Sequence, residues 1–172
     1  MENAFLCLGL PERLAFSEEE LREKWHALSR EGAQASANQA WETLRSSARR
    51  ARHLLTLRAP EVKLKGMTIS EPLFALFDGV GRALDTVGSY LEAKEGADSA
   101  LAKALLVGRQ LEAKESLDEM TAKVSEAISE IEKQFPEWDR EPERETLARM
   151  AADLGFLEKW LEQLRQKQVE LF

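Results

Sequence analysis

Residues 37–57 read ANQAWETLRSSARRARHLLTL, and this stretch decides the fold of the first part of the chain. Its apolar residues recur at intervals of three and four, the spacing of one face of an α-helix. They are Ala40, Trp41, Leu44, Ala48, Ala51, Leu54, Leu55 and Leu57. The pattern is interrupted at Ser46-Ser47, so it predicts either one long helix or two short helices with a break there.

A helix is also expected before this stretch. Ser17 is followed three residues later by Glu20, which is the pattern of a capping box, so a helix should begin at Ser17. Its buried side would carry Leu21, Trp25 and Leu28, and Gly32 would end it. Residues 3–10 form a short apolar segment that is closed by Gly9 and followed by Pro11.

The rest of the chain predicts three long helices. Residues 60–71 contain Pro60 and Gly66 and should form a connection. Apolar residues with helical spacing then follow in residues 72–92, in residues 101–135 and from residue 147 to residue 164, with a loop at 136–143. The second of these stripes includes Leu101, Leu105, Leu111, Leu117, Met120, Val124, Ile128, Ile131 and Phe135. We expect an all-α protein whose residues 72–172 form an antiparallel three-helix bundle.

Charge is distributed unevenly along the chain. Residues 1–60 hold nine Lys and Arg against eight acidic residues, whereas residues 61–172 hold fifteen against twenty-three. An acidic chain without a basic face repels phosphate backbones, so the composition argues against nucleic-acid binding. No apolar run approaches the roughly 20 residues that span a bilayer. Together with the single cysteine, Cys7, this predicts a soluble cytoplasmic protein that binds no membrane.

The inventory of chemically active residues argues against an enzyme. His26 and His53 are the two histidines of the sequence, and neither stands at a spacing that pairs it with Cys7 or with a carboxylate. We interpret both as partly exposed helix residues. With so few nitrogen and sulfur ligands we expect no metal site and no cofactor. Gly79 and Gly81 lie inside a helical pattern and should permit close packing or a kink.

Two further groups of side chains have alternative interpretations. Trp25 and Trp41 fall on apolar stripes and are expected in the core, whereas Trp138 lies in the predicted loop and should be half-exposed. The basic cluster consists of Arg45, Arg49, Arg50, Arg52 and Arg58. We interpret it as a solvated face, with a docking site for the acidic second half of the chain or for an acidic partner as the alternative.

The first sixty residues resemble a J domain, and the whole chain resembles the HscB-type iron–sulfur co-chaperones. The resemblance rests on residues 4–11 (AFLCLGLP), 21–28, 38–45 (NQAWETLR) and 50–55 (RARHLL), with weaker support from residues 156–159 (FLEK). It implies a J-like domain at residues 1–60, a connection at 61–71 and the family's C-terminal three-helix bundle at 72–172. It further implies protein partners, namely an iron–sulfur scaffold or client protein and a DnaK-type chaperone.

The chain departs from the family where J domains stimulate their chaperone. The positions equivalent to the family's His-Pro-Asp motif are about Ala33, Gln34 and Ala35, and the loop is shorter. Neither alanine nor glutamine supplies the missing imidazole and carboxylate. The helix that would face the chaperone is also rich in glutamate, so steering onto an acidic chaperone is weak or reversed. Contacts to a chaperone or another acidic partner would come from Arg22, Lys24, Arg49 and Arg50.

In the family, the start of the first bundle helix contacts the scaffold protein. The matching residues here are Leu73, Phe74, Leu76, Phe77 and Asp78. Phe74 lies off the main stripe, so it is either an exposed contact or buried against the J-like half. The resemblance therefore predicts a protein-binding module of iron–sulfur assembly that cannot stimulate a chaperone ATPase. The alternative is a structural or adaptor protein that kept the fold and binds an unrelated protein.

Overall fold

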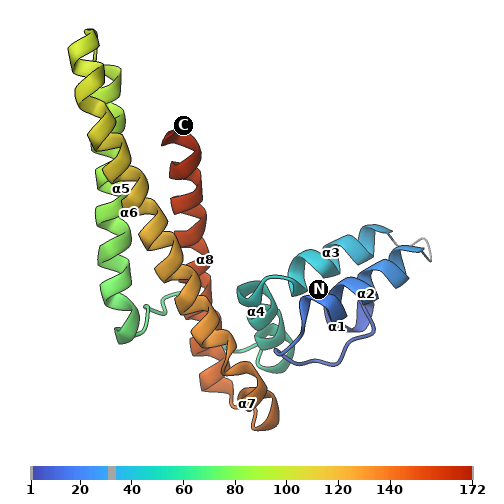
Figure 1. The fold of residues 1–172 in the computed structure, drawn as a ribbon. Coiled ribbons are helices and arrows are strands. Elements are labelled where there is room, and N and C mark those ends of the chain that lie inside the picture. The colour runs from blue at the N-terminus through green and yellow to red at the C-terminus, as the bar shows by residue number, and fades with distance from the viewer. Residues whose placement is uncertain (1, 31–33, 172) are drawn as a thin grey trace. The chain divides into compact units, whose positions relative to one another are not determined.

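The protein, seen in a computed structural model, is described for residues 2–30 and 34–171, and most of these residues are helical (Figure 1). The helices are α1 (Ala4–Cys7), α2 (Glu18–Arg30), α3 (Gln34–Leu44), α4 (Ser47–Arg58), α5 (Phe74–Glu95), α6 (Ala100–Glu132), α7 (Phe135–Arg140) and α8 (Arg144–Leu171), with a 3-10 turn, η1 (Glu71–Leu73), before α5. The described residues contain no strand, which confirms the predicted all-α fold.

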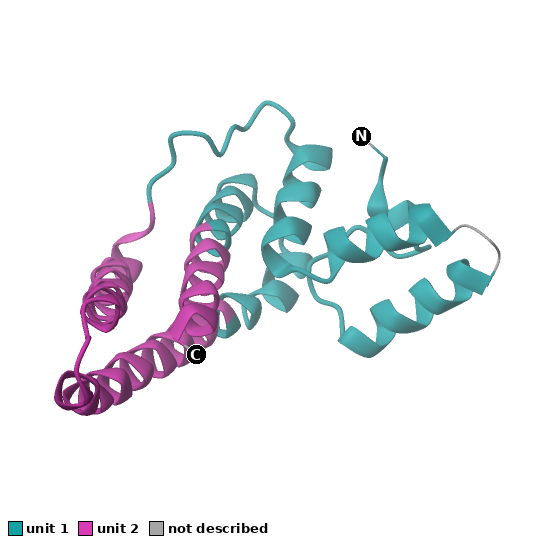
Figure 2. Ribbon diagram, turned by 90° about the horizontal axis from the view of Figure 1, so that it is seen from above, with its two compact units in different colours: residues 1–68, 129–155 teal, residues 69–128, 156–172 magenta. Residues whose placement is uncertain are grey.

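The chain forms two compact units (Figure 2). Unit 1 comprises Met1–Thr68 and Ser129–Gly155, and unit 2 comprises Ile69–Ile128 and Phe156–Phe172. The long helices α6 and α8 therefore each contribute to both units. The sequence instead predicted two continuous domains, residues 1–60 and 72–172. This division stays a prediction.

Unit 1 contains the stretch that opened the sequence analysis, and it forms two helices. Chain direction changes between α3 and α4, where Ser46 has extended backbone angles and its hydroxyl accepts the N–H of Arg49. This N-cap satisfies a backbone donor that a helix start leaves free, so a second helix begins there. Ser17 caps α2 in the same way, because its hydroxyl accepts the N–H of Glu20. The expected start of α2 is confirmed, and of the two alternatives for residues 37–57 the structure has two helices with a break.

Helices α2 and α3 form a hairpin whose tryptophans are less buried than predicted. Leu21 is buried, but Trp25 and Trp41 are both half-buried, so their assignment to the core is wrong. Their rings lie against each other with centroids 5.6 Å apart, and the Trp25 indole N–H donates to Asn38 at 2.9 Å. The two rings therefore cover part of each other's surface.

Residues 136–143 were expected to form a loop, but residues 135–140 form α7. Helix α6 ends at Glu132, and Pro136 stands in the first turn of α7, a position where its missing N–H costs nothing. Trp138 is buried rather than half-exposed, and its indole N–H donates to the carbonyl of Glu143 at 2.8 Å. The Asp139 carboxylate accepts the N–H of Leu14 and the N–H of Ala15, each at 2.8 Å. Through these bonds α7 anchors the segment before α2.

Unit 2 is a three-helix bundle of α5, most of α6 and the end of α8. Residue numbers at the contacts between α5 and α6 run in opposite directions. Gly79 lies against Met120, and the carbonyl of Ser89 accepts a hydrogen bond from Arg109. The same holds for α6 and α8, where Gln110 donates to Leu171 and Gln168 donates to Asp118. Neighbouring helices are thus antiparallel, as predicted. Fully buried residues of this bundle include Val87, Leu117, Leu157 and Leu164.

The predicted stripe of α6 is wrong over its first three turns. Leu101, Leu105 and Leu111 are exposed by 71%, 70% and 56%, whereas the buried row begins at Ala113 and continues through Leu117. Apolar spacing marks a helical face but does not say whether another helix covers it. No described helix is long and apolar enough to cross a membrane.

Candidate functional site

The start of α5 presents an exposed aromatic patch. Leu73 in the turn η1 is buried, while Phe74 and Phe77 are 54% and 59% exposed. Residues three apart lie on the same side of a helix, so the two rings are neighbours. We call this surface, with the half-buried Leu76 and the exposed Asp78, the Phe74–Phe77 patch. Its residues are those that the sequence assigned to partner binding.

Packing beneath the patch explains why Phe77 is outside. Sequence spacing placed Phe77 on the buried stripe, but the helix is turned so that Gly79, Val80 and Ala83 face inward. At Gly79 an added Cβ would lie 2.9 Å from the Met120 side chain, so this glycine permits close packing, whereas Gly81 faces open space. Phe77 still contacts the bundle through Trp160, with ring centroids 5.8 Å apart. The patch is therefore positioned by buried contacts on its inner side.

Exposed phenylalanines on a supported helix are suited to binding another protein. Exposure of two neighbouring rings to water is unfavourable, so the free energy falls when a partner covers them. Aromatic anchors of this kind dominate many interfaces. Asp78 is paired with Arg82 one turn further on, so the polar edge of the patch is neutralised within α5. An apolar partner surface therefore fits this patch better than a charged one.

The tip of the α2–α3 hairpin is the second predicted site. Ala33 lies outside the described residues, and Gln34 and Ala35 form the first turn of α3. The Gln34 side-chain amide donates to Asn38 at 2.9 Å. At Gln34 and Ala35 the described chain offers neither an imidazole nor a carboxylate, so these two positions cannot reproduce the polar group of a His-Pro-Asp motif.

The four cations predicted to contact an acidic partner have different environments. Lys24 is exposed, Arg22 is exposed and paired with Glu18, and Arg49 is exposed and lies 3.6 Å from Glu42. Arg50 is only 6% exposed and donates to the carbonyl of Leu44 at 3.0 Å. Its interpretation as part of a solvated face or as a surface contact is therefore wrong.

His53 is buried as well, which corrects its interpretation as a partly exposed residue. Its Nε2 atom accepts the N–H of Ala4 at 3.0 Å, and its ring stacks on Phe5 with centroids 5.7 Å apart. Burial lowers the pKa of His53, although the Glu12 carboxylate acts in the opposite direction. A neutral ring is the form that can accept this bond. His53 is thus a structural link between α4 and α1, while His26 is exposed as expected.

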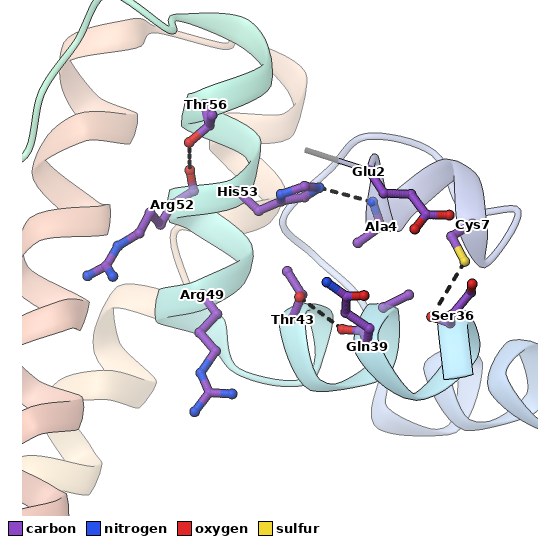
Figure 3. Close-up of a pocket in the computed structure, with 11 residues that line it drawn as sticks. Glu2, Ala4, Cys7, Ser36, Gln39, Thr43, Arg49, Arg52, His53 and Thr56 are labelled. Carbon is purple, nitrogen blue, oxygen red and sulfur yellow. Dashed lines mark hydrogen bonds between the residues drawn. The ribbon is translucent and has the colours of Figure 1, made fainter. Parts of the chain in front are cut away.

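A pocket of about 230 Å³ adjoins His53 (Figure 3). Its lining comes from α1, α3 and α4, and it includes Cys7, whose thiol donates to the carbonyl of Ser36 at 3.6 Å. Burial raises the pKa of the Cys7 thiol, and the Glu2 carboxylate adds to this effect, so the reactive thiolate is disfavoured. Among the described residues no cluster of three or more His, Cys, Asp or Glu side chains is arranged to hold a metal ion.

The buried roles of Arg50 and His53 were missed because both residues are polar. A signal was present, since Ser47, Arg50 and His53 follow each other at intervals of three and all three are buried. This second row flanks the apolar stripe of α4 and widens its buried face. A buried polar side chain needs a hydrogen-bond partner, and Arg50 and His53 each have one.

No protein-family model matches the sequence. Among solved structures, the chain is similar to the chaperone HscB from Vibrio cholerae, with a TM-score of 0.64 and 18% sequence identity. The similarity covers 99% of this chain and 100% of that protein. At this identity the likeness concerns the fold, and the chain therefore has an HscB-like all-α fold along its whole length.

Proposed function

We propose that this protein is a non-enzymatic co-chaperone-like module that binds an iron–sulfur scaffold or client protein through the Phe74–Phe77 patch. The observation that carries the proposal is the exposure of both rings, by 54% and 59%, on a helix start that Leu73 and Trp160 support from within. The HscB-like fold over 99% of the chain supports the same assignment.

The second part of the proposal is that the J-like half, residues 1–60, does not accelerate ATP hydrolysis by a DnaK-type chaperone. Gln34 and Ala35 lack the required polar groups, and Arg50 is withdrawn into the interior. Arg22 and Arg49 are each paired with a glutamate, which weakens their attraction for an acidic chaperone. Lys24 is then the remaining cation for such a contact. This half would brace the molecule while the bundle, residues 72–172, holds the partner.

Binding to a purified iron–sulfur scaffold protein from the same organism tests the first part. Isothermal titration should show binding by the wild-type chain, and the double substitution F74A/F77A should weaken it by about 30-fold or more, because loss of a central aromatic costs about 2 kcal/mol. The matched control is L101A/L105A, which removes two side chains of greater exposure from the same bundle. Equal losses in both variants, or no binding by the wild type, would contradict the assignment.

ATP turnover by a DnaK-type chaperone tests the second part. Adding the protein should leave the rate unchanged, and a several-fold rise would show that the interpretation of the hairpin is wrong. The alternative function is an adaptor that uses the same aromatic patch for an unrelated protein. Affinity purification with wild-type and F74A/F77A baits distinguishes the two, because a patch-dependent partner outside iron–sulfur assembly would favour the adaptor.

A further inference from the structure

A second hollow of unit 1 shares no lining residue with the His53 pocket. It is open to solvent, has a volume of about 800 Å³, and is lined by residues of the segment before α2, of α2, α3 and α4, and of the chain around α7. Much of its lining is apolar, with Leu21 and Phe135 buried and Trp41 half-buried. Arg50 belongs to the same lining. The hollow thus combines apolar walls with a buried cation.

The guanidinium of Arg50 has fewer partners than its burial requires. It can donate five N–H bonds, and one of its terminal nitrogens donates to the carbonyl of Leu44 at 3.0 Å. Its Nε atom is buried and has no hydrogen-bond partner among the described residues. The charge lies over the rings of Phe16 and Phe135, at 5.8 and 5.7 Å from their centroids. Within residues 2–30 and 34–171 no carboxylate lies at ion-pair distance from it.

A buried charge of this kind is costly without a counter-charge. Aromatic faces compensate a cation partly, but they do not replace the hydrogen bonds that water would supply. Burial lowers the pKa of Arg50, and the carboxylates of Glu132 and Asp139 counteract this from a distance. An oxyanion placed against the guanidinium would supply both charge and acceptors.

The rim of the hollow limits how much negative charge can enter. Glu18 and Glu132 line it and are both exposed. Arg45 also lines it, but this side chain lies 3.5 Å from Glu42 and is partly neutralised. The fixed charges of the hollow therefore nearly balance, so a group with one negative charge is accepted more readily than a phosphate-rich ligand.

We propose that this hollow binds a small molecule that joins a single oxyanion, such as a carboxylate or sulfonate, to a flat apolar ring system. The oxyanion would lie against Arg50, and the rings would lie against Trp41 and Leu21. This site is separate from the Phe74–Phe77 patch, so it does not depend on the protein-binding function proposed above.

Two fluorescent probes with similar rings test the proposal on the full chain. One is 1-anilinonaphthalene-8-sulfonate, and the other is N-phenyl-1-naphthylamine, which lacks the sulfonate. Titration should show saturable binding of the sulfonate at least about tenfold tighter than binding of the neutral probe, because a charge-assisted contact adds to ring burial. Equal affinities, or no saturable binding of the sulfonate, would overturn the proposal.

Neighbouring arginines provide the decisive comparison. R50Q should abolish the preference for the anionic probe, whereas R49Q should leave it unchanged, because Arg49 is exposed and does not line this hollow. Near-ultraviolet circular dichroism checks that R50Q is folded. A folded R50Q that still prefers the sulfonate, or an R49Q that loses the preference equally, would refute the role of Arg50.

A surface substitution keeps the test valid if R50Q fails to fold. E132Q removes a negative charge from the rim and should tighten sulfonate binding about threefold to tenfold at low salt, without affecting the neutral probe. E126Q is the matched control, since Glu126 is an exposed glutamate of α6 that does not line the hollow. Unchanged binding by E132Q, or equal tightening in both variants, would place the sulfonate elsewhere. F74A/F77A should bind the sulfonate like the wild type, and a loss there would assign the probe to the aromatic patch.

Discussion

Replacing Asp139 by alanine should destabilise unit 1 more than any surface change on α7. Both oxygens of this carboxylate accept a backbone N–H, from Leu14 and from Ala15, each at 2.8 Å. Leu14 is fully buried, so in D139A its N–H loses an acceptor where water has little access. A hydrogen bond to a charged group contributes about 1.5–3 kcal/mol, which gives a loss of about 3–6 kcal/mol for the pair. This is a large part of a typical stability of about 5–15 kcal/mol.

Urea unfolding followed by tryptophan fluorescence measures this loss, because Trp138 is buried beside Asp139. With a slope of about 2 kcal/mol/M, the midpoint should fall by about 1.5–3 M at an unchanged slope. D139N keeps one oxygen acceptor and should lose less. E137A is the control, since Glu137 is exposed on the same short helix and should change stability by less than about 0.5 kcal/mol. A loss below about 1 kcal/mol in D139A would refute the account of this anchor.

Three further predictions concern stability. His53 is neutral in the folded protein, and burial lowers its pKa. The unfolded chain therefore binds more protons below about pH 6.5, so the free energy of unfolding should fall as the pH decreases from there. H53Q should show a flatter dependence of this free energy on pH, and identical pH profiles in the two proteins would contradict the prediction. In urea unfolding, G81A should stabilise the protein by about 1 kcal/mol, because the added Cβ meets open space. G79A should gain less stability because Met120 must move, and an equal gain in the two variants would refute the packing at Gly79. S46A should cost about 1 kcal/mol by removing the cap of α4, and no loss would show that the cap is not needed.

The residues at the start of α5 show how much of the candidate site could be predicted from the sequence. Sequence matching predicted that Leu73, Phe74, Leu76, Phe77 and Asp78 form one partner-binding group. Their position on one helix start follows from their spacing. Which of them face water did not follow, because the rotation of α5 is set by Gly79 lying against Met120 on α6. A contact between residues so distant in the chain has no local signature.

The basic cluster shows the opposite case. Five arginines within fourteen residues suggested a solvated face, yet Arg50 is buried between Phe16 and Phe135. Helical spacing could have placed Arg50 beside the buried row, but its aromatic partners come from the segment before α2 and from α7. The sequence gives no direct sign that these segments meet at α4.

Local physical chemistry written in the sequence determined the helices themselves. Apolar spacing, the capping serines and the prolines predicted α2 to α6 and α8, because helix starts and stops depend on neighbouring residues. The tertiary structure decided which apolar faces are covered. It left Leu101 and Phe77 in water, buried Trp138, and gave His53 and Arg50 their structural positions. Burial depends on which distant segment packs over a side chain, and that is a property of the whole fold rather than of any stretch within it.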